Sequence, residues 1–116
     1  MNVFFDVEGT LLGAGRARPH VRRVFEKLIS EGHHVYIWSG GGARYAKNAA
    51  ETLGVEDLIF GIFSKSSDLP VAVDFAVDDY PDLVLRHGGY VVEAFEGDPD
   101  DSKLLEVLGA VKAHER

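Results

Sequence analysis

Residues 3–12 read VFFDVEGTLL, and this stretch decides how the rest of the chain is interpreted. An apolar run typical of a buried strand ends in two acids, Asp6 and Glu8, followed by Gly9 and Thr10. In extended backbone, residues i and i+2 point the same way, so both acids are aimed at one point beyond the strand. Buried carboxylates are costly unless a metal ion or a hydrogen-bonding partner compensates them. The stretch therefore predicts a strand that delivers acids to a functional site.

The rest of the chain alternates strands and helices. Apolar runs predict strands at residues 3–7, 35–38, 58–63, 75–77 and 90–92. Helical spacing with proline and glycine boundaries predicts helices between 19 and 32, 42 and 54, 81 and 88, and after an acidic turn at 98–102. The core face expected for the last helix consists of Leu104, Leu105, Leu108 and Val111.

Near-continuous apolar strands separated by helices indicate a central parallel sheet covered on both faces. We expect one Rossmann-like α/β domain over residues 1–116, with a sheet of about five strands. Ligands of such sheets bind beyond the carboxyl ends of the strands, at the point where strand order reverses. Asp6, Ser39 and Asp78 each fall at that end of a predicted strand.

The composition excludes several classes of function. A net charge of −7 argues against general affinity for nucleic acid or an anionic membrane. The chain has no cysteine, which rules out a disulfide or a thiolate zinc site. No apolar run approaches the roughly 20 residues of a membrane span, and the chain enters a strand at once, without a signal-peptide pattern. The expected location is the cytoplasm.

Four stretches, in order along the chain, resemble the four motifs of the haloacid dehalogenase (HAD) superfamily. They are residues 6–10, of the form Asp-x-Glu-x-Thr, residues 38–40 with Ser39, residues 63–65 with Lys65, and the acidic residues 77–82. The resemblance covers roughly residues 3–95 and is fairly specific, because each stretch follows an apolar run in the order that the family has.

The resemblance implies a Mg²⁺-dependent phosphomonoester hydrolase. Asp6 would attack phosphorus and form an aspartyl-phosphate, which splits one displacement into two easier ones. Glu8 would be the general acid and base, and Lys65 would neutralise the phosphate and the nucleophile. The implied Mg²⁺ ligands are Asp6, the backbone carbonyl of Glu8 and Asp78, with Asp79 as a further metal-side acid that either faces the ion through water or orients Lys65.

Ser39 and the glycines that follow it precede a predicted helix. Backbone N–H groups of Ser39, Gly40 and Gly41, together with the helix dipole, suit a phosphate group. The alternative is a loop that needs small residues for its turns. The glycines do not match the Gly-x-Gly-x-x-Gly spacing of a dinucleotide site.

Glu8 departs from the family pattern, because typical HAD phosphatases have Asp there. Glu can transfer protons, but its carboxyl group lies about 1 Å farther out, and misplacement of that size can cost on the order of a hundredfold in rate. Three outcomes stay open: full activity with adjusted geometry, slow turnover, or a trapped or inactive site. The last corresponds to a HAD-fold module that binds metal, phosphate or a protein partner.

Another class, the response-regulator receiver domain, is also a small acidic α/β fold. It would need its acidic pair after the first strand and its lysine after the last. Here Lys65 precedes the pair formed by Asp78 and Asp79, which disfavours that class.

Other charged residues are secondary candidates. Asp82 is a further possible metal-side acid, and Lys47 competes with Lys65 but lies too far along its helix. The cluster Asp98, Asp100 and Asp101 is expected to be a solvated helix N-terminus. His33 and His34 are expected to be packing or surface residues. Arg16 and Arg18 follow the first motif, where the family has a mobile flap, and either meet an anionic substrate or stay in solvent.

The chain has no room for the specificity caps of the HAD family. Residues 11–18 are too few for one, and residues 52–64 are taken up by a helix end and a strand. The resemblance then implies the capless class, whose members act on large or macromolecular phosphorylated substrates or close the site by homo-oligomerisation. The substrate itself is left open.

Overall fold

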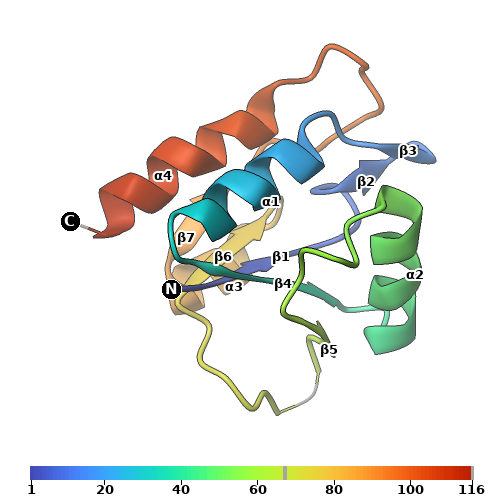
Figure 1. The fold of residues 1–116 in the computed structure, drawn as a ribbon. Helices are drawn as coiled ribbons and strands as arrows, with labels where there is room; N and C mark the ends of the chain where they lie inside the picture. The colour runs from blue at the N-terminus through green and yellow to red at the C-terminus, as the bar shows by residue number, and fades with distance from the viewer. Residues whose placement is uncertain (67, 116) are drawn as a thin grey trace.

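The computed structural model describes residues 1–66 and 68–115. Its centre is a five-stranded parallel sheet of order β5-β4-β1-β6-β7 (Figure 1). The strands are β1 (Asn2–Phe5), β4 (His34–Ser39), β5 (Gly61–Ser64), β6 (Phe75–Asp78) and β7 (Gly89–Val91). The predicted Rossmann-like α/β architecture is confirmed.

Helices flank this sheet. They are α1 (Val21–Ser30), α2 (Ala43–Leu53), α3 (Pro81–His87), a short 3₁₀ helix η1 (Lys103–Leu105) and α4 (Glu106–Glu115). Helices α1 and α4 contact each other and lie across the same face (Figure 1). Helix α3 contacts β6 and β7, and α2 contacts β4 and β5.

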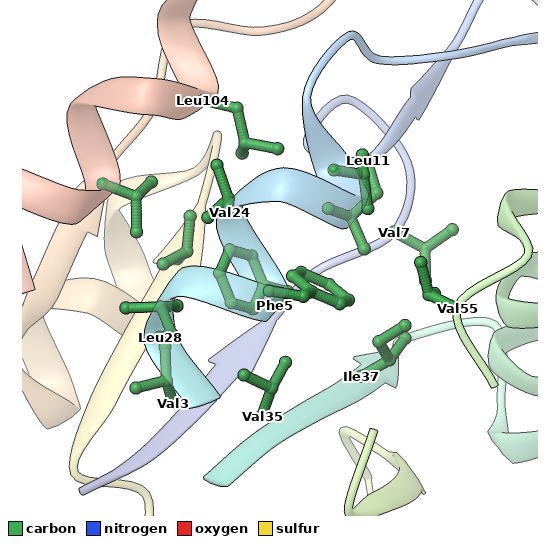
Figure 2. Packing of buried hydrophobic residues seen from close by; sticks show 14 of the residues in the cluster. Val3, Phe5, Val7, Leu11, Val24, Leu28, Val35, Ile37, Val55 and Leu104 are labelled. Carbon is green, nitrogen blue, oxygen red and sulfur yellow. The ribbon is translucent and has the colours of Figure 1, made fainter. Parts of the chain in front are cut away.

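The alternation of side chains along β1 divides the core into two parts. Phe5 lies in the larger cluster with Val24 and Leu28 of α1 and with Leu104, and Figure 2 shows these side chains gathered over the strands. Phe4 points to the opposite face, where it packs with Val84 of α3. Because both faces of β1 are apolar and covered, the strand is a central one, as its sequence predicts.

Three expectations need correction. Residues 12–17 form a small antiparallel hairpin of β2 (Leu12–Gly13) and β3 (Arg16–Ala17) instead of a plain loop. The strand expected from residue 58 begins only at Gly61. In the last helical segment Val107 is buried, whereas Leu105 and Leu108 are only half-buried. The 3₁₀ turn of η1 has fewer residues per turn than an α-helix, so it changes which side chains of α4 face the core.

The described residues contain no inserted cap at either expected position. The β2–β3 hairpin occupies the first gap, and residues 54–60 connect α2 directly to β5. Within the described part of the chain, none of the helices is both long and apolar enough to cross a membrane.

Candidate functional site

Strand order brings the first two acids together. Strands β1 and β6 are parallel neighbours with Phe5 opposite Val77, so Asp6 and Asp78 leave the same edge of the sheet side by side. The backbone N–H of Asp6 extends the ladder by donating to the Val77 carbonyl over 3.0 Å. Both acids are buried, at 7% and 2% exposure. The prediction that their strands are adjacent is confirmed.

Lys65 bridges these two carboxylates. Its Nζ lies 2.6 Å from Asp6 Oδ1 and 2.9 Å from Asp78 Oδ2. The turn after β5 is held in place because the Lys65 N–H donates to the Ser39 carbonyl over 3.0 Å. Burial lowers the pKa of Lys65, but hydrogen bonds to Asp6 and Asp78 outweigh that effect and raise it, so the amine stays protonated.

Asp6 has a strongly perturbed acidity. Burial raises its pKa from 3.8 to about 7, although the hydrogen bond and the charge of Lys65 act to lower it. The nearby charge of Asp78 and a hydrogen bond with Asp79 raise it further. Carboxylates that lie close together repel one another when they are ionised. A bound metal cation relieves this repulsion, so such a cluster favours a cation.

A third carboxylate completes the cluster. One oxygen from each of Asp6, Asp78 and Asp79 lies within 4.8 Å of the others. Thr10 Oγ1 donates to Asp6 Oδ2 at 3.2 Å and, weakly, to Asp79 Oδ1 at 3.4 Å. Gly9 has φ of +81°, and a Cβ there would overlap Asp79 Oδ2, so glycine is needed for this approach. Asp79 therefore meets Thr10, and it is Asp6 and Asp78 that orient Lys65.

The donor set of this cluster fits Mg²⁺. Carboxylate oxygens are the hard ligands that the ion prefers, and it keeps positions for water or phosphate oxygen. Asp78 Oδ1 is already fixed, because it accepts the Tyr80 N–H over 3.0 Å. The Glu8 side chain is not part of the three-carboxylate cluster.

Glu8 is held by a partner that sequence reasoning missed. Its side chain is exposed, and Oε1 accepts a hydrogen bond from the Tyr45 hydroxyl on the first turn of α2. This hydrogen bond is the main reason that the pKa of Tyr45 is raised to about 12. The expectation that Glu8 converges on Asp6 with Asp78 and Asp79 is thus wrong for its carboxyl group, which the longer side chain brings to α2.

The glycine segment is only partly available to a ligand. Ser39, Gly40 and Gly41 do line the candidate pocket. However, the Gly41 N–H donates to Ser39 Oγ over 3.0 Å, and the Gly42 N–H donates to the Ser39 carbonyl over 3.2 Å. One of the three expected phosphate donors, the Gly41 N–H, and the N–H of the next glycine are therefore engaged within the segment, as in the loop alternative.

These residues surround one pocket of about 600 Å³. Its lining consists of Asp6, Glu8, Ser39, Gly40, Gly41, Tyr45, Lys65, Asp78, Asp79, Tyr80, Asp82 and Leu83. Every site residue predicted from the sequence is thus brought to one place, and Asp82 lies there too, outside the carboxylate cluster. Tyr80 and Leu83 were missed, although Tyr80 lies within the acidic fourth stretch and Leu83 directly follows it.

The secondary candidates lie elsewhere. Arg16 and Lys47 are exposed and do not line the pocket. Arg18 is buried and donates to Asp101 Oδ1 over 2.9 Å, so it does not face a substrate. Asp101 is therefore not a solvated residue, contrary to expectation, although its Oδ1 also accepts the Lys103 N–H at the start of η1.

The two histidines behave as packing and surface residues. His33 is buried and contacts the N-terminal amine through Nδ1, over 3.0 Å. His34 is exposed and stacks on the ring of Phe60. Neither lines the pocket.

Comparison of the chain with family models, curated proteins and solved structures found no match. The HAD resemblance therefore depends on the four stretches and on the way that the fold assembles them. Lys65 of the third stretch contacts both Asp6 of the first stretch and Asp78 of the fourth. Ser39 of the second stretch lines the same pocket.

Proposed function

We propose that this protein is a Mg²⁺-dependent phosphomonoester hydrolase of the HAD type. The observation that carries the proposal is the ammonium group of Lys65, bound between Asp6 and Asp78 at the floor of an open pocket. A buried carboxylate beside a fixed cation is equipped to attack an electrophile and to release it again.

The reaction has two balanced steps. An oxygen of Asp6 forms a bond to phosphorus while the bond to the leaving oxygen breaks, and that oxygen takes a proton from Glu8. In the second step water attacks phosphorus and gives its proton to Glu8. The bond between phosphorus and the Asp6 oxygen breaks at the same time, which frees the Asp6 carboxylate and inorganic phosphate. Lys65 stays protonated and balances negative charge on the nucleophile and the phosphoryl oxygens.

Asp6, Asp78 and Asp79 would hold Mg²⁺, together with the Glu8 carbonyl. When bound, the ion supplies charge neutralisation, so that the anionic phosphate group can approach three carboxylates. The side chains contribute orientation: Thr10 holds one oxygen of Asp6, Lys65 holds the other, and Tyr80 fixes Asp78 through its N–H.

A second candidate is a weakly active or inactive module that binds metal or phosphate. The hydrogen bond between Glu8 and Tyr45 favours this second candidate, because it keeps the carboxyl group of Glu8, the candidate general acid, against α2. Substrate contact would then have to release or redirect Glu8 before a proton could be transferred.

An assay with and without Mg²⁺ tests the leading proposal. Wild type is expected to hydrolyse an aryl phosphate only with Mg²⁺, and Asp6→Asn is expected to abolish turnover while the protein stays folded, because only a carboxylate can attack. Asp100→Asn is the matched control, since Asp100 is exposed and does not line this pocket. Turnover in Asp6→Asn at the wild-type rate would refute the proposal.

Thermal melting tests the metal separately. Mg²⁺ is expected to raise the melting temperature of wild type and of Asp100→Asn by mass action, but not that of Asp78→Asn. If the shift survives in Asp78→Asn and disappears in Asp100→Asn, the ion binds at the acidic segment 98–101 instead. A shift in wild type without hydrolysis would favour the binding module.

A further inference from the structure

Besides Glu8, the exposed edge of the pocket carries side chains that the hydrolytic steps do not use. We call the residues Glu8, Tyr45, Tyr80, Asp82 and Leu83 the pocket rim. Tyr80 is 73% exposed and Tyr45 is 36% exposed, and both line the pocket. Both side chains therefore border the pocket that a leaving group attached to a phosphate at Asp6 would occupy.

The rim has an uncompensated negative charge. Lys65 is the only cationic side chain among the described residues that line the pocket, and it is already bound to Asp6 and Asp78. Asp82 lies on the first turn of α3 and forms no ion pair with any described residue. Because Glu8 changes its protonation during the proposed reaction, Asp82 is the rim carboxylate whose charge persists.

Aromatic side chains line the same pocket as this charge. Tyr80 precedes Asp82 at the start of α3, and Tyr45 faces the pocket from α2. A cation is attracted both by a carboxylate and by the face of a tyrosine ring, whereas an anion is repelled by the carboxylate. The net charge of −7 acts in the same direction over longer range.

We propose that the leaving group of the substrate is cationic: the substrate is a small phosphorylated amine whose ammonium group meets Asp82 and Tyr80. This rests on the proposed phosphomonoester hydrolysis. The pocket of about 600 Å³ is in the range that takes small molecules, which favours a metabolite-sized amine. Substrates with anionic leaving groups, such as phosphorylated carboxylic acids, are disfavoured.

Three aryl phosphates that differ only in remote charge test this inference. They are the phosphate esters of 4-(2-aminoethyl)phenol, 4-ethylphenol and 3-(4-hydroxyphenyl)propionate, whose phenols are similar leaving groups. We expect kcat/KM to fall in that order, by about tenfold for each step in charge, because two charges about 6 Å apart interact by about that much at an effective dielectric constant of about 40, between the values of a protein surface and bulk water. Added salt is expected to reduce the differences in kcat/KM between the three esters, because it screens the charges.

Asp82→Asn is the decisive variant. We expect it to reduce the ratio of the cationic to the neutral ester from about tenfold to about one. Asp100→Asn is expected to keep the wild-type ratio, because that exposed acid does not line the pocket. Equal kcat/KM for all three esters, or an unchanged ratio in Asp82→Asn, would overturn the inference while leaving the hydrolase proposal intact.

If no ester is hydrolysed, the hydrolase proposal fails, and binding decides the inference about the rim. The matched arylphosphonates, which cannot be hydrolysed, are titrated calorimetrically in the presence of Mg²⁺. Tighter binding of the cationic analogue that disappears in Asp82→Asn would support the rim as a cation site of a binding module. Equal binding of the three analogues, or no binding, would refute it.

Discussion

The hydroxyl of Tyr45 fixes the carboxyl group of Glu8, to which the proposed hydrolysis assigns proton transfer. Glu8 is one methylene longer than Asp, and that length lets Oε1 accept the hydrogen bond from α2. A fixed carboxylate loses less conformational entropy on reaching the leaving oxygen than a freely rotating one. Under the leading proposal Tyr45 is therefore a positioning residue for Glu8, whereas under the second candidate it holds Glu8 away from the substrate.

Tyr45→Phe is expected to lower kcat by about tenfold with little change in KM, because it frees Glu8 without removing it. In a Glu8→Asp background the same change is expected to have no effect, since the shorter side chain does not reach Tyr45. Steady-state kinetics of the four proteins measure this coupling. Equal losses in both backgrounds would mean that Tyr45 contributes to the pocket by itself.

The carboxylate cluster of the pocket, together with Glu8 and Asp82, was predictable from sequence, and Tyr45 was not. Asp6 and Asp78 directly follow apolar strands, and parallel strands deliver their carboxyl ends to one edge. Tyr45 is 37 residues from Glu8 in sequence, and nothing in the spacing of α2 indicates which side chain it meets. Such contacts depend on tertiary placement, which periodicity does not encode.

At the level of elements, buried Arg18 connects three segments around the site. Its guanidinium donates to the Thr10 carbonyl at 3.3 Å, to the Glu93 carbonyl at 2.7 Å and to Asp101 at 2.9 Å. The side chain thereby joins the loop after β1 and the β2–β3 hairpin to the segment that precedes η1. It also lies over the ring of Phe95.

Arg18→Ala is expected to lower the free energy of unfolding by about 3–5 kcal/mol, because Asp101 and several carbonyls lose their partner. Urea unfolding measures this loss. The double variant with Asp101→Ala is expected to be less unstable than the sum of the single variants, since the second change removes the stranded carboxylate. A loss below about 1 kcal/mol would mean that the ion pair is solvent-screened.

Long apolar elements were predicted better than short ones. The five parallel strands and four helices follow from apolar runs and from proline or glycine boundaries. The β2–β3 hairpin has strands of only two residues each, too short for an alternating pattern to show. Its position depends on Arg18, whose partner Asp101 is 83 residues away.

At the scale of the whole molecule, the buried carboxyl group of Asp6 makes the free energy of unfolding depend on pH. Burial raises the pKa of Asp6 from 3.8 to about 7, so the folded metal-free protein binds this proton more tightly than the unfolded chain does. The stability that this group contributes is fully present below pH 3.8 and is lost as pH rises to about 7. An ionised Asp6 is therefore a destabilising element until a cation is added.

Asp6→Asn removes this dependence, because an amide does not ionise. The measured quantity is the free energy of unfolding of wild type minus that of Asp6→Asn, with a chelator present. We expect this difference to fall as pH rises from about 4 to about 7, and to stay constant at higher pH. Urea unfolding at intervals of pH measures the difference, in which other titrating groups cancel. Parallel profiles for the two proteins would contradict the assigned burial effect.

The central claim is that Asp6 becomes phosphorylated during turnover, and rapid acid quenching followed by mass spectrometry tests it most directly. With Mg²⁺ and an aryl phosphate, wild type is expected to gain one phosphoryl group in the peptide that contains Asp6, and Asp6→Asn is expected to gain none. Hydrolysis by wild type with no phosphoryl group on Asp6 at any quench time, or with the group on another residue, would contradict the account.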